Sequence, residues 1–426
     1  MAPAYIIPPG IHAISEDLLD LRHDTEIDHD IRLPRPITSE KNIWFFWDKG
    51  YATLLSKTGW TVRVLDRVPG SPLNVDQYLP ITEETFPRAF VKGTVNGHYA
   101  AQHTSDLVRF PLLLKYGGVY ADVGLMQIGD LNHLWNSTIA SPSSPIEVIS
   151  YGLGSRSEHG LANYFLVSGP DNPFFLRCHR LFLALWAEEG GKTSTEGMHR
   201  SPLISMVSKL EGEFEIVEED GERFGPLEVS EMLTDYIAQG QTITMVQGLV
   251  DEEDGWDGPE YSAKHVFAIP YMEGSQLINE YTAWNGQRAF DLMSLPLAKD
   301  GEQEIADQKA AREIIEACLA RSFGFKLAHG LILRVFKVTL GSLWRQHEGS
   351  DDVPETYAHW LRYGMVHWCP DRSPTRLEYE VIEPIKRGRL LGAQQARIDH
   401  ITTGARTSHR WFVEDTSKNS TYSIDS

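Results

Sequence analysis

Residues 105–124 constrain the fold of this chain more than any other segment, because they join a helical pattern to a strand through two glycines. Apolar residues at helical spacing run to Tyr116, and Gly117 and Gly118 then allow the helix to end in a tight turn. The stretch 119–123 that follows is apolar except for Asp122 and predicts a buried strand. We therefore expect an α/β domain whose active centre lies in this segment.

Polar side chains stand at informative positions within the same segment. Asp106 and Arg109 are three residues apart, so they share one face of the predicted helix. Tyr120 and Asp122 are two apart and point to the same side of the predicted strand. Open α/β sheets bind their ligands beyond the carboxyl ends of the strands, which is where Asp122 lies. Taken singly, these residues would be a surface ion pair and a strand-end turn, but the combined pattern is too specific for that. We therefore expect Asp106, Arg109 and Asp122 to be catalytic residues.

Strands and helices alternate along much of the chain. Apolar runs predict two further strands, at residues 42–47 and 59–65, in the same sheet as residues 119–123. This alternation favours a mostly parallel sheet. The predicted domains are an irregular arm, a catalytic domain, a helical basic C-terminal region and a disordered tail, with the boundaries 1–38, 39–300, 301–417 and 418–426.

The pattern Ser105-Asp-x-x-Arg, followed by Gly117-Gly-x-Tyr-x-Asp, resembles that of a glycosyltransferase family. The family contains initiating mannosyltransferases, capsular-polysaccharide synthesis proteins and the large clostridial glucosylating toxins. Residues 41–50, 59–66 and 161–174 resemble three further blocks of the capsular group, so the resemblance covers roughly residues 42–180. It implies a GT-A-like catalytic domain, Rossmann-like in its sheet, with a helical C-terminal extension.

The resemblance also implies roles for single residues. Trp47 would line or stack on a nucleotide base, although core packing is the alternative for this indole. Asp106 and Arg109 would bind polar groups of the donor, and Tyr120 and Asp122 would contact the ribose or the sugar. Three more residues near the motif are expected to bind substrate, with helix capping or packing as the alternative for the first two: Ser105, His103 and Asn163.

Gly124 is where the sequence departs from the family pattern. Most such enzymes carry Asp-x-Asp, whose second carboxylate holds Mn²⁺ or Mg²⁺ against the diphosphate of the donor. Hard cations need oxygen ligands, and glycine offers no side chain. We therefore expect no cofactor and no tightly bound metal at Asp122, although a glycosyltransferase of the usual kind would use one of these two cations.

A stretch of the C-terminal region lacks acidic residues altogether, from Ala317 to His347. Residues 325–345 predict one helix, on which four basic side chains fall within an arc of about 100°. Such a face binds RNA phosphates or an anionic membrane, or is simply solvated, and the sequence leaves these three alternatives equal. The four candidate RNA-binding residues are Lys326, Arg334, Lys337 and Arg345.

Three classes of function remain. Our first choice is an arginine-containing cyclodipeptide synthase that uses aminoacyl-tRNA, because Gly124 and the acid-free basic stretch fit it. The alternative is a glycosyltransferase that uses a sugar nucleotide, and the third is a non-catalytic binding protein. Three widely spaced cysteines, the absence of a signal-peptide pattern and the absence of a long apolar stretch predict a soluble, cytoplasmic enzyme without a transmembrane segment.

Overall fold

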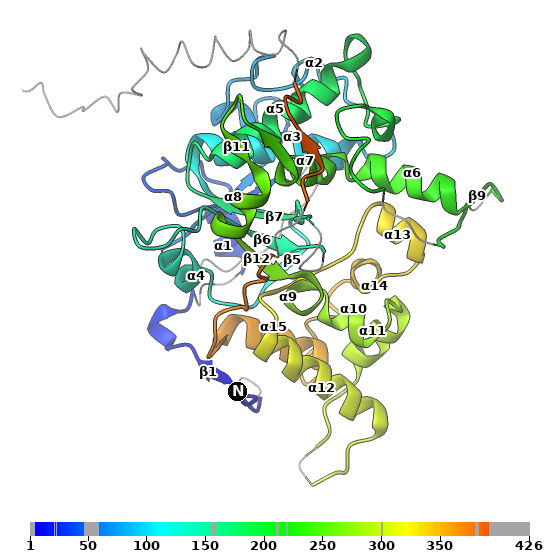
Figure 1. Ribbon diagram of the computed structural model, residues 1–426. Helices are drawn as coiled ribbons and strands as arrows, with labels where there is room; N and C mark the ends of the chain where they lie inside the picture. The colour runs from blue at the N-terminus through cyan, green and yellow to red at the C-terminus, as the bar shows by residue number, and fades with distance from the viewer. Residues whose placement is uncertain are drawn as a thin grey trace, which may run out of the picture.

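The computed structural model describes residues 5–20, 22, 24–46, 59–154, 159–209, 213–218, 220–299, 301–379 and 383–391. They form a mixed α/β protein around a six-stranded central sheet (Figure 1). From one edge to the other, the strands are β12 (Val266–Pro270), β6 (Val148–Gly152), β7 (Phe165–Ser168), β4 (Gly118–Ala121), β2 (Asn42–Phe46) and β3 (Thr61–Leu65).

The three strands predicted around the motif are neighbours in this sheet. β2 lies between β3 and β4 and is parallel to both, with Trp44 opposite Tyr120. Successive residues of β2 enter two different cores: Trp44 and Phe46 pack on one face, Ile43 and Phe45 on the other. Burial on both faces explains why β2 is an uninterrupted apolar run.

The sheet is mixed, whereas the sequence predicted a mostly parallel one. β7 is antiparallel to both of its neighbours, β4 and β6, while β12 is parallel to β6. After β6 the chain turns back at an antiparallel bridge between Gly152 and Leu161, and β7 then runs antiparallel to β6.

Helix α3 (Ala100–Tyr116) carries the polar motif and packs against the sheet. It contacts β2, β4 and the helix α5 (Pro173–Ala187), and α5 packs in turn on α7 (Ala238–Gln247). The apolar sides of these elements form the largest core. Asp106 and Arg109 are buried under this layer rather than displayed on an outer face of the helix.

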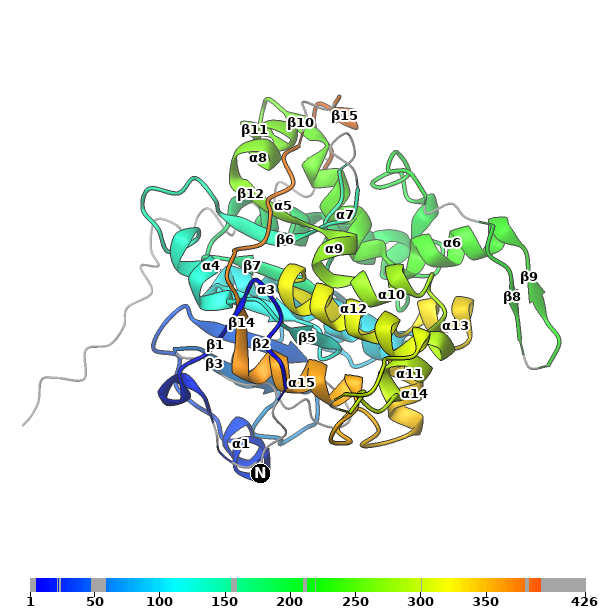
Figure 2. The same cartoon turned by 90° about the horizontal axis from the view of Figure 1, so that it is seen from below.

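A second core is built from helices of the C-terminal half. It joins α10 (Leu277–Tyr281), α11 (Gly286–Ser294), α12 (Ala306–Arg321), α14 (Leu340–Gln346) and α15 (Tyr357–His367), and α12 runs beside α15 (Figure 2). The N-terminal segment reaches this region through β1 (Ile11–Ala13), which pairs with β14 (Trp368–Pro370). The segment expected to be an irregular arm thus contains β1 and the helix α1 (Asp24–Ile31).

The prediction of one helix over residues 325–345 is wrong. The segment contains the strand β13 (Gly324–Lys326), then α13 (Leu331–Phe336), and then α14. The helical path is interrupted at Gly330 and Lys337, whose φ angles are 59° and 63°. β13 instead pairs antiparallel with β5 (Leu125–Gln127), directly after the motif.

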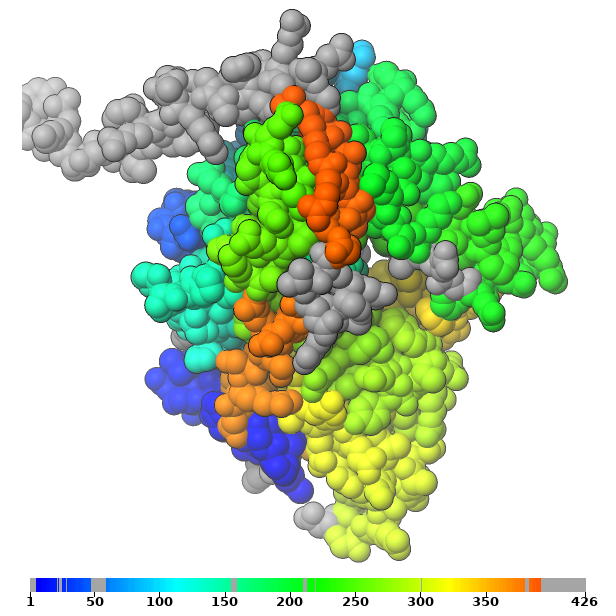
Figure 3. Space-filling model, in the orientation of Figure 1, coloured from blue at the N-terminus to red at the C-terminus, as the bar shows by residue number. Residues whose placement is uncertain are grey.

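The remaining elements are short or peripheral, and the β8–β9 hairpin projects from the body of the molecule (Figures 2 and 3). They are η1 (Glu16–Leu18), η2 (Val75–Gln77), α2 (Arg88–Val91), α4 (Leu131–Ser137), η3 (Glu188–Gly190), η4 (Met198–Arg200), β8 (Ile216–Val217), β9 (Arg223–Phe224), α6 (Pro226–Tyr236), β10 (Leu249–Asp251), β11 (Trp256–Asp257), α8 (Gly258–His265), α9 (Tyr271–Ser275) and β15 (Lys386–Arg387).

Candidate functional site

The centre of the motif is the guanidinium group of Arg109. Its Nη2 lies 2.9 Å from Asp106 Oδ1, one turn back on α3, and 3.0 Å from Asp122 Oδ1, just beyond β4. The structure therefore brings together the three residues expected to be catalytic. Neutralising one side chain of this group lowers the free energy of unfolding, because the opposite charge that it compensated stays buried.

Polar groups from two other elements hold Arg109 in place. Its Nη1 donates to the carbonyl oxygen of Asn163 at 2.7 Å and to Gln239 Oε1 at 3.3 Å. The Gln239 amide also donates to the carbonyl oxygen of Asp106, at 2.5 Å. Asn163 was expected at the site, whereas sequence reasoning missed Gln239, which lies on α7 and is fully buried.

His103 and Asp106 form a second, inner pair. His103 Nδ1 lies 3.3 Å from Asp106 Oδ2, and His103 Nε2 lies 3.0 Å from the hydroxyl oxygen of Thr195. Both members of the pair are buried. Held on both ring nitrogens, His103 supports Asp106, and Thr195 is a second partner that sequence reasoning missed.

Tyr120 and Ser105 lie behind Arg109. The Tyr120 hydroxyl and the Ser105 hydroxyl are 2.6 Å apart, and the Arg109 guanidinium carbon lies 4.9 Å from the centre of the Tyr120 ring. Tyr120 has no exposed surface, and burial raises the pKa of its hydroxyl to about 12. In this structure the ring of Tyr120 packs against the guanidinium group of Arg109, although the resemblance implied a direct contact of Tyr120 with ribose or sugar.

Asp122 is the carboxylate that a ligand can reach. Its side chain is 25% exposed, against 7% for Asp106 and 5% for Arg109. Its second oxygen, Oδ2, lies 3.3 Å from the ammonium nitrogen of Lys326. The pairing of β13 with β5 places Lys326 there, opposite Leu125 in the register.

Lys326, His329 and Arg345 form what we call the basic cluster, beside Gly124. An ideal Cβ atom built on Gly124 would lie 2.5 Å from His329 Nε2 and 3.3 Å from Lys326 Nζ. Arg345 Nη1 donates to His329 Nδ1 at 2.6 Å. Burial, together with the charges of Lys326 and Arg345, lowers the pKa of His329 to about 2, so that this ring is neutral at physiological pH.

The other two candidate RNA-binding residues lie elsewhere. Arg334 pairs with Glu218 and lies 5.2 Å from the centre of the Phe224 ring, and Lys337 donates to the carbonyl oxygen of Val217. Arg334 therefore contacts β9 and the residue that follows β8, and Lys337 contacts β8. The four basic residues do not share one helix face, because the chain between them is broken into separate elements.

Trp47, the residue expected to line or stack on a nucleotide base, lies outside the described residues, so the structure does not place it.

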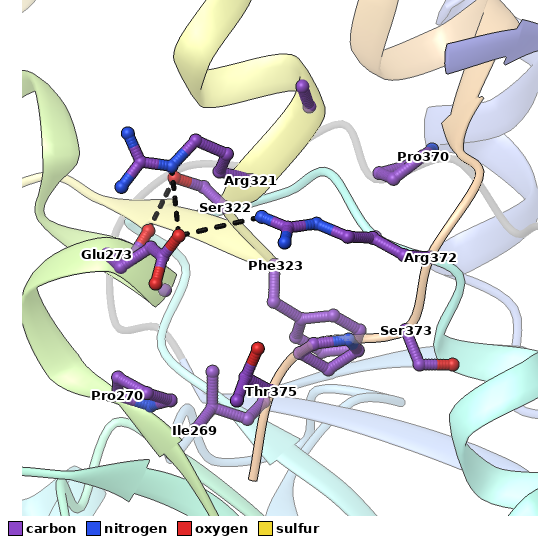
Figure 4. Close-up of a pocket in the computed structure, with 14 residues that line it drawn as sticks. Ile269, Pro270, Glu273, Arg321, Ser322, Phe323, Pro370, Arg372, Ser373 and Thr375 are labelled. Atoms are coloured by element: carbon purple, nitrogen blue, oxygen red, sulfur yellow. Dashed lines mark hydrogen bonds and ion pairs between the residues drawn. The ribbon is translucent and has the colours of Figure 1, made fainter. Parts of the chain in front are cut away.

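A shallow pocket opens at the far end of the β5–β13 ladder from Asp122, beside Gly129 and Phe323 (Figure 4). Both arginines of this pocket share one carboxylate, since Glu273 pairs with Arg321 at 2.9 Å and with Arg372 at 3.5 Å.

The residues around Asp122 do not fit a divalent cation. Such an ion needs several oxygen ligands, but Asp122 already faces the cationic groups of Arg109 and Lys326. Gly124 supplies no carboxylate, and His329 occupies the space where one would project. Within the described parts of the chain, no three acidic, histidine or cysteine side chains are grouped as metal ligands would be.

Comparison with known proteins identifies relatives over almost the whole chain. A family model described as a glycosyltransferase sugar-binding region containing a DXD motif matches residues 56–142. The O-glycosyltransferase braB of Annulohypoxylon truncatum is 31% identical over 404 residues, which are 90% of this chain and 94% of that protein. The probable glycosyltransferase FCK3 of Fusarium pseudograminearum is 32% identical over 401 residues, 87% of this chain and 95% of that protein.

Among solved structures, the PaToxG glycosyltransferase aligns with 39% of this chain and 70% of its own, at 14% identity and a TM-score of 0.25. That likeness is too weak to carry an argument about the fold. No helix in the described parts of the chain has the length and apolar character needed to cross a membrane.

These comparisons change the order of our hypotheses. They support the alternative, a glycosyltransferase, and they give no support to a cyclodipeptide synthase or to aminoacyl-tRNA as a substrate. The features that favoured the synthase were Gly124 and the basic stretch. In the structure, two of the four candidate RNA-binding residues, Lys326 and Arg345, lie in the basic cluster beside Gly124.

Proposed function

We propose that this chain, which belongs to the same glycosyltransferase family as these fungal proteins, binds its nucleotide-sugar donor beside Asp122 and transfers the sugar to a hydroxyl group. The chain is a transferase, and its family implies a sugar nucleotide as the donor. A hydroxyl acceptor is proposed because braB is named an O-glycosyltransferase. A GT-A-like catalytic domain and a cytoplasmic location remain part of this proposal.

The observation that carries the position of the donor is the network of Asp106, Arg109 and Asp122. Parallel strands β2, β3 and β4 place their carboxyl ends at one edge of the sheet, and Asp122 follows β4 at that edge. Ligands of open α/β sheets bind at this edge. The supporting shell of Asn163, Gln239 and the buried Tyr120 keeps the exposed carboxylate in one position.

The chemistry that we assign to Asp122 is recognition of hydroxyl groups. A carboxylate accepts several hydrogen bonds, and the ribose and the sugar of a nucleotide donor offer hydroxyl donors. Arg109 holds Oδ1 of Asp122 and thereby orients it, while the partly exposed group faces the ligand. Asp106 is a positioning residue, because it is buried and acts on the ligand through Arg109.

The experiment compares Asp122→Asn with the unchanged chain. Nucleoside diphosphate release would be measured from a panel of nucleotide sugars with small hydroxylated acceptors. Losing a charge-assisted contact to the donor weakens an interaction of roughly 1.5–3 kcal/mol, so turnover should fall about tenfold or more. The melting temperature should fall less in Asp122→Asn than in Asp106→Asn, because Asp122 is the most exposed carboxylate of the network and Asp106 is buried.

The matched control is Asp307→Asn. Asp307 also pairs with an arginine, Arg288, at 2.6 Å, but on an exposed surface of the helical region. That variant should keep full turnover. If no nucleotide sugar supports transfer, or if Asp122→Asn is as active as the control, the proposed site is wrong.

A further inference from the structure

We infer that the basic cluster (Lys326, His329 and Arg345) binds the diphosphate of the nucleotide donor directly, at the position where the family motif supplies a carboxylate for a divalent cation. The inference rests on the proposed function and adds the means by which this chain holds the donor's charge. It starts from the poor fit of a divalent cation: Gly124 contributes no carboxylate two residues after Asp122, and His329 already fills the space beside Gly124.

A carboxylate at position 124 is incompatible with the observed position of His329. A Cβ atom there would lie 2.5 Å from His329 Nε2, a separation that real Cβ atoms essentially never show. An aspartate would therefore displace His329 from between Gly124 and Arg345. The glycine and the cluster thus depend on each other, because the small residue is what lets the basic groups approach Asp122.

Lys326 supplies a positive charge where a cation would otherwise stand. Its ammonium nitrogen lies 3.3 Å from Asp122 Oδ2 and 3.2 Å from the carbonyl oxygen of Leu327. An ammonium group has three donors, so these two contacts leave one for a phosphate oxygen. The side chain is only 12% exposed, and in such surroundings an ion contact is stronger than at an open surface.

His329 adds a neutral donor to the cluster. Arginine has no acceptor, so Arg345 must donate to His329 Nδ1, at 2.6 Å. Because the pKa of His329 is lowered to about 2, the neutral ring then carries its proton on Nε2, the atom nearest to Gly124. His329 Nε2 and the ammonium nitrogen of Lys326 both border the space that a side chain at Gly124 would fill.

Arg345 completes the cluster at its outer side. It is exposed, and among the described residues its side chain makes hydrogen bonds only to His329. A guanidinium group has five donors, so several remain for the second phosphate. Two formal positive charges and one neutral donor are well matched to a diphosphate, and Arg109 already balances part of the charge of Asp122.

During sugar transfer, the basic cluster would stabilise the diphosphate as the leaving group. In sugar transfer, the bond between the anomeric carbon and the diphosphate oxygen breaks, and its electron pair stays on that oxygen. The acceptor oxygen bonds to the anomeric carbon and loses its proton to the solvent. Negative charge therefore grows on the diphosphate, and fixed positive groups stabilise it more in the transition state than in the bound donor.

The test measures binding before any turnover. Inorganic pyrophosphate and UDP would be titrated into the full chain by calorimetry, with EDTA present throughout. We expect binding without metal, and binding about tenfold weaker or more in Lys326→Met and in Arg345→Met. Arg345 is exposed, so its loss leaves the fold intact, and Arg345→Lys should restore part of the affinity. The control Lys337→Met removes a basic group that contacts the β8–β9 hairpin instead, and should bind as the unchanged chain does.

The two proposals fail in different ways. Binding that requires Mg²⁺ or Mn²⁺, or that survives both Lys326→Met and Arg345→Met, overturns the role of the basic cluster. Transfer from a nucleotide sugar that stops in EDTA also overturns it, while leaving the glycosyltransferase intact. Metal-free pyrophosphate binding without transfer from any nucleotide sugar supports the cluster and counts against the proposed function.

Discussion

At the scale of single residues, the two carboxylates of the motif have different tasks although they share one arginine. Asp106 is buried, and His103, Arg109 and the amide of Asn163 surround it. Asp122 is partly exposed and is approached by Lys326. Both carboxylates contact the same guanidinium nitrogen, but only Asp122 combines a fixed position with access to a ligand.

His329 gives a prediction on pH and stability. Its pKa is about 2 in the folded chain and near 6.5 without burial, so the unfolded chain binds a proton first as the pH falls. The stability contributed by the neutral ring is complete above pH 6.5 and is lost as the pH falls towards 2. The loss amounts to at most about 1.4 kcal/mol for each pH unit.

The variant His329→Gln keeps a donor and an acceptor but cannot titrate. Its free energy of unfolding should fall less steeply than that of the unchanged chain between pH 6.5 and pH 4.5. Urea denaturation at several pH values measures both slopes. Parallel curves would show that His329 is protonated in the folded chain, contrary to its position between Lys326 and Arg345.

Local spacing was enough to predict some of these residues and not others. Asp106, Arg109 and Asp122 are close in sequence, so helix and strand periodicity places them together. Gln239 is 130 positions from Arg109, and no pattern in its own segment predicts that its side chain is buried beside Arg109. Lys326 was singled out for its charge, but its partner Asp122 depends on strand pairing that no local pattern reveals.

At the scale of elements, the helix-to-strand turn determines how the site is assembled. Gly117 and Gly118 have φ angles of 64° and 91°, and β4 begins at Gly118. The sequence predicted α3, β2, β3 and β4, because each of these segments has a clear pattern of apolar residues. It did not predict the break between β13 and α14, because the apolar spacing there continues through Gly330 and Lys337 and only the backbone angles differ.

Gly118→Ala tests the tight approach at this turn. A Cβ atom would lie 2.4 Å from the carbonyl oxygen of Asn42 on β2, and the φ angle is unfavourable for alanine. The left-handed backbone alone costs roughly 1–2 kcal/mol, so we expect a total loss above about 2 kcal/mol in unfolding free energy. Gly169→Ala is the matched control, because no atom lies within 4 Å of its Cβ position, and it should be nearly neutral. Equal stability of the two variants would contradict the close approach of this turn to β2.

At the scale of the whole molecule, the helical C-terminal half and the sheet share both a core and the site. Phe323 follows α12 but is buried in the core on the sheet, 5.9 Å from Phe165 between ring centres. Its carbonyl oxygen accepts from the backbone of Ile128 and of Gly129, at 3.0 and 2.9 Å. The site also needs both halves, since Asp122 comes from one and Lys326 from the other.

Phe323→Ala therefore tests whether the predicted boundary at residue 300 separates independent units. Truncating a buried phenylalanine costs about 3–5 kcal/mol. If the sheet and the helical half unfold together, calorimetry should show one transition, moved as a whole to a lower temperature. Ile305→Ala, at a position that is 58% exposed in the same half, should leave the transition where it is. Two transitions, of which Phe323→Ala moves only one, would mean that the halves are separate domains. In that case Lys326 would reach Asp122 only through docking of the two, and pyrophosphate binding should then disappear at the lower of the two transitions.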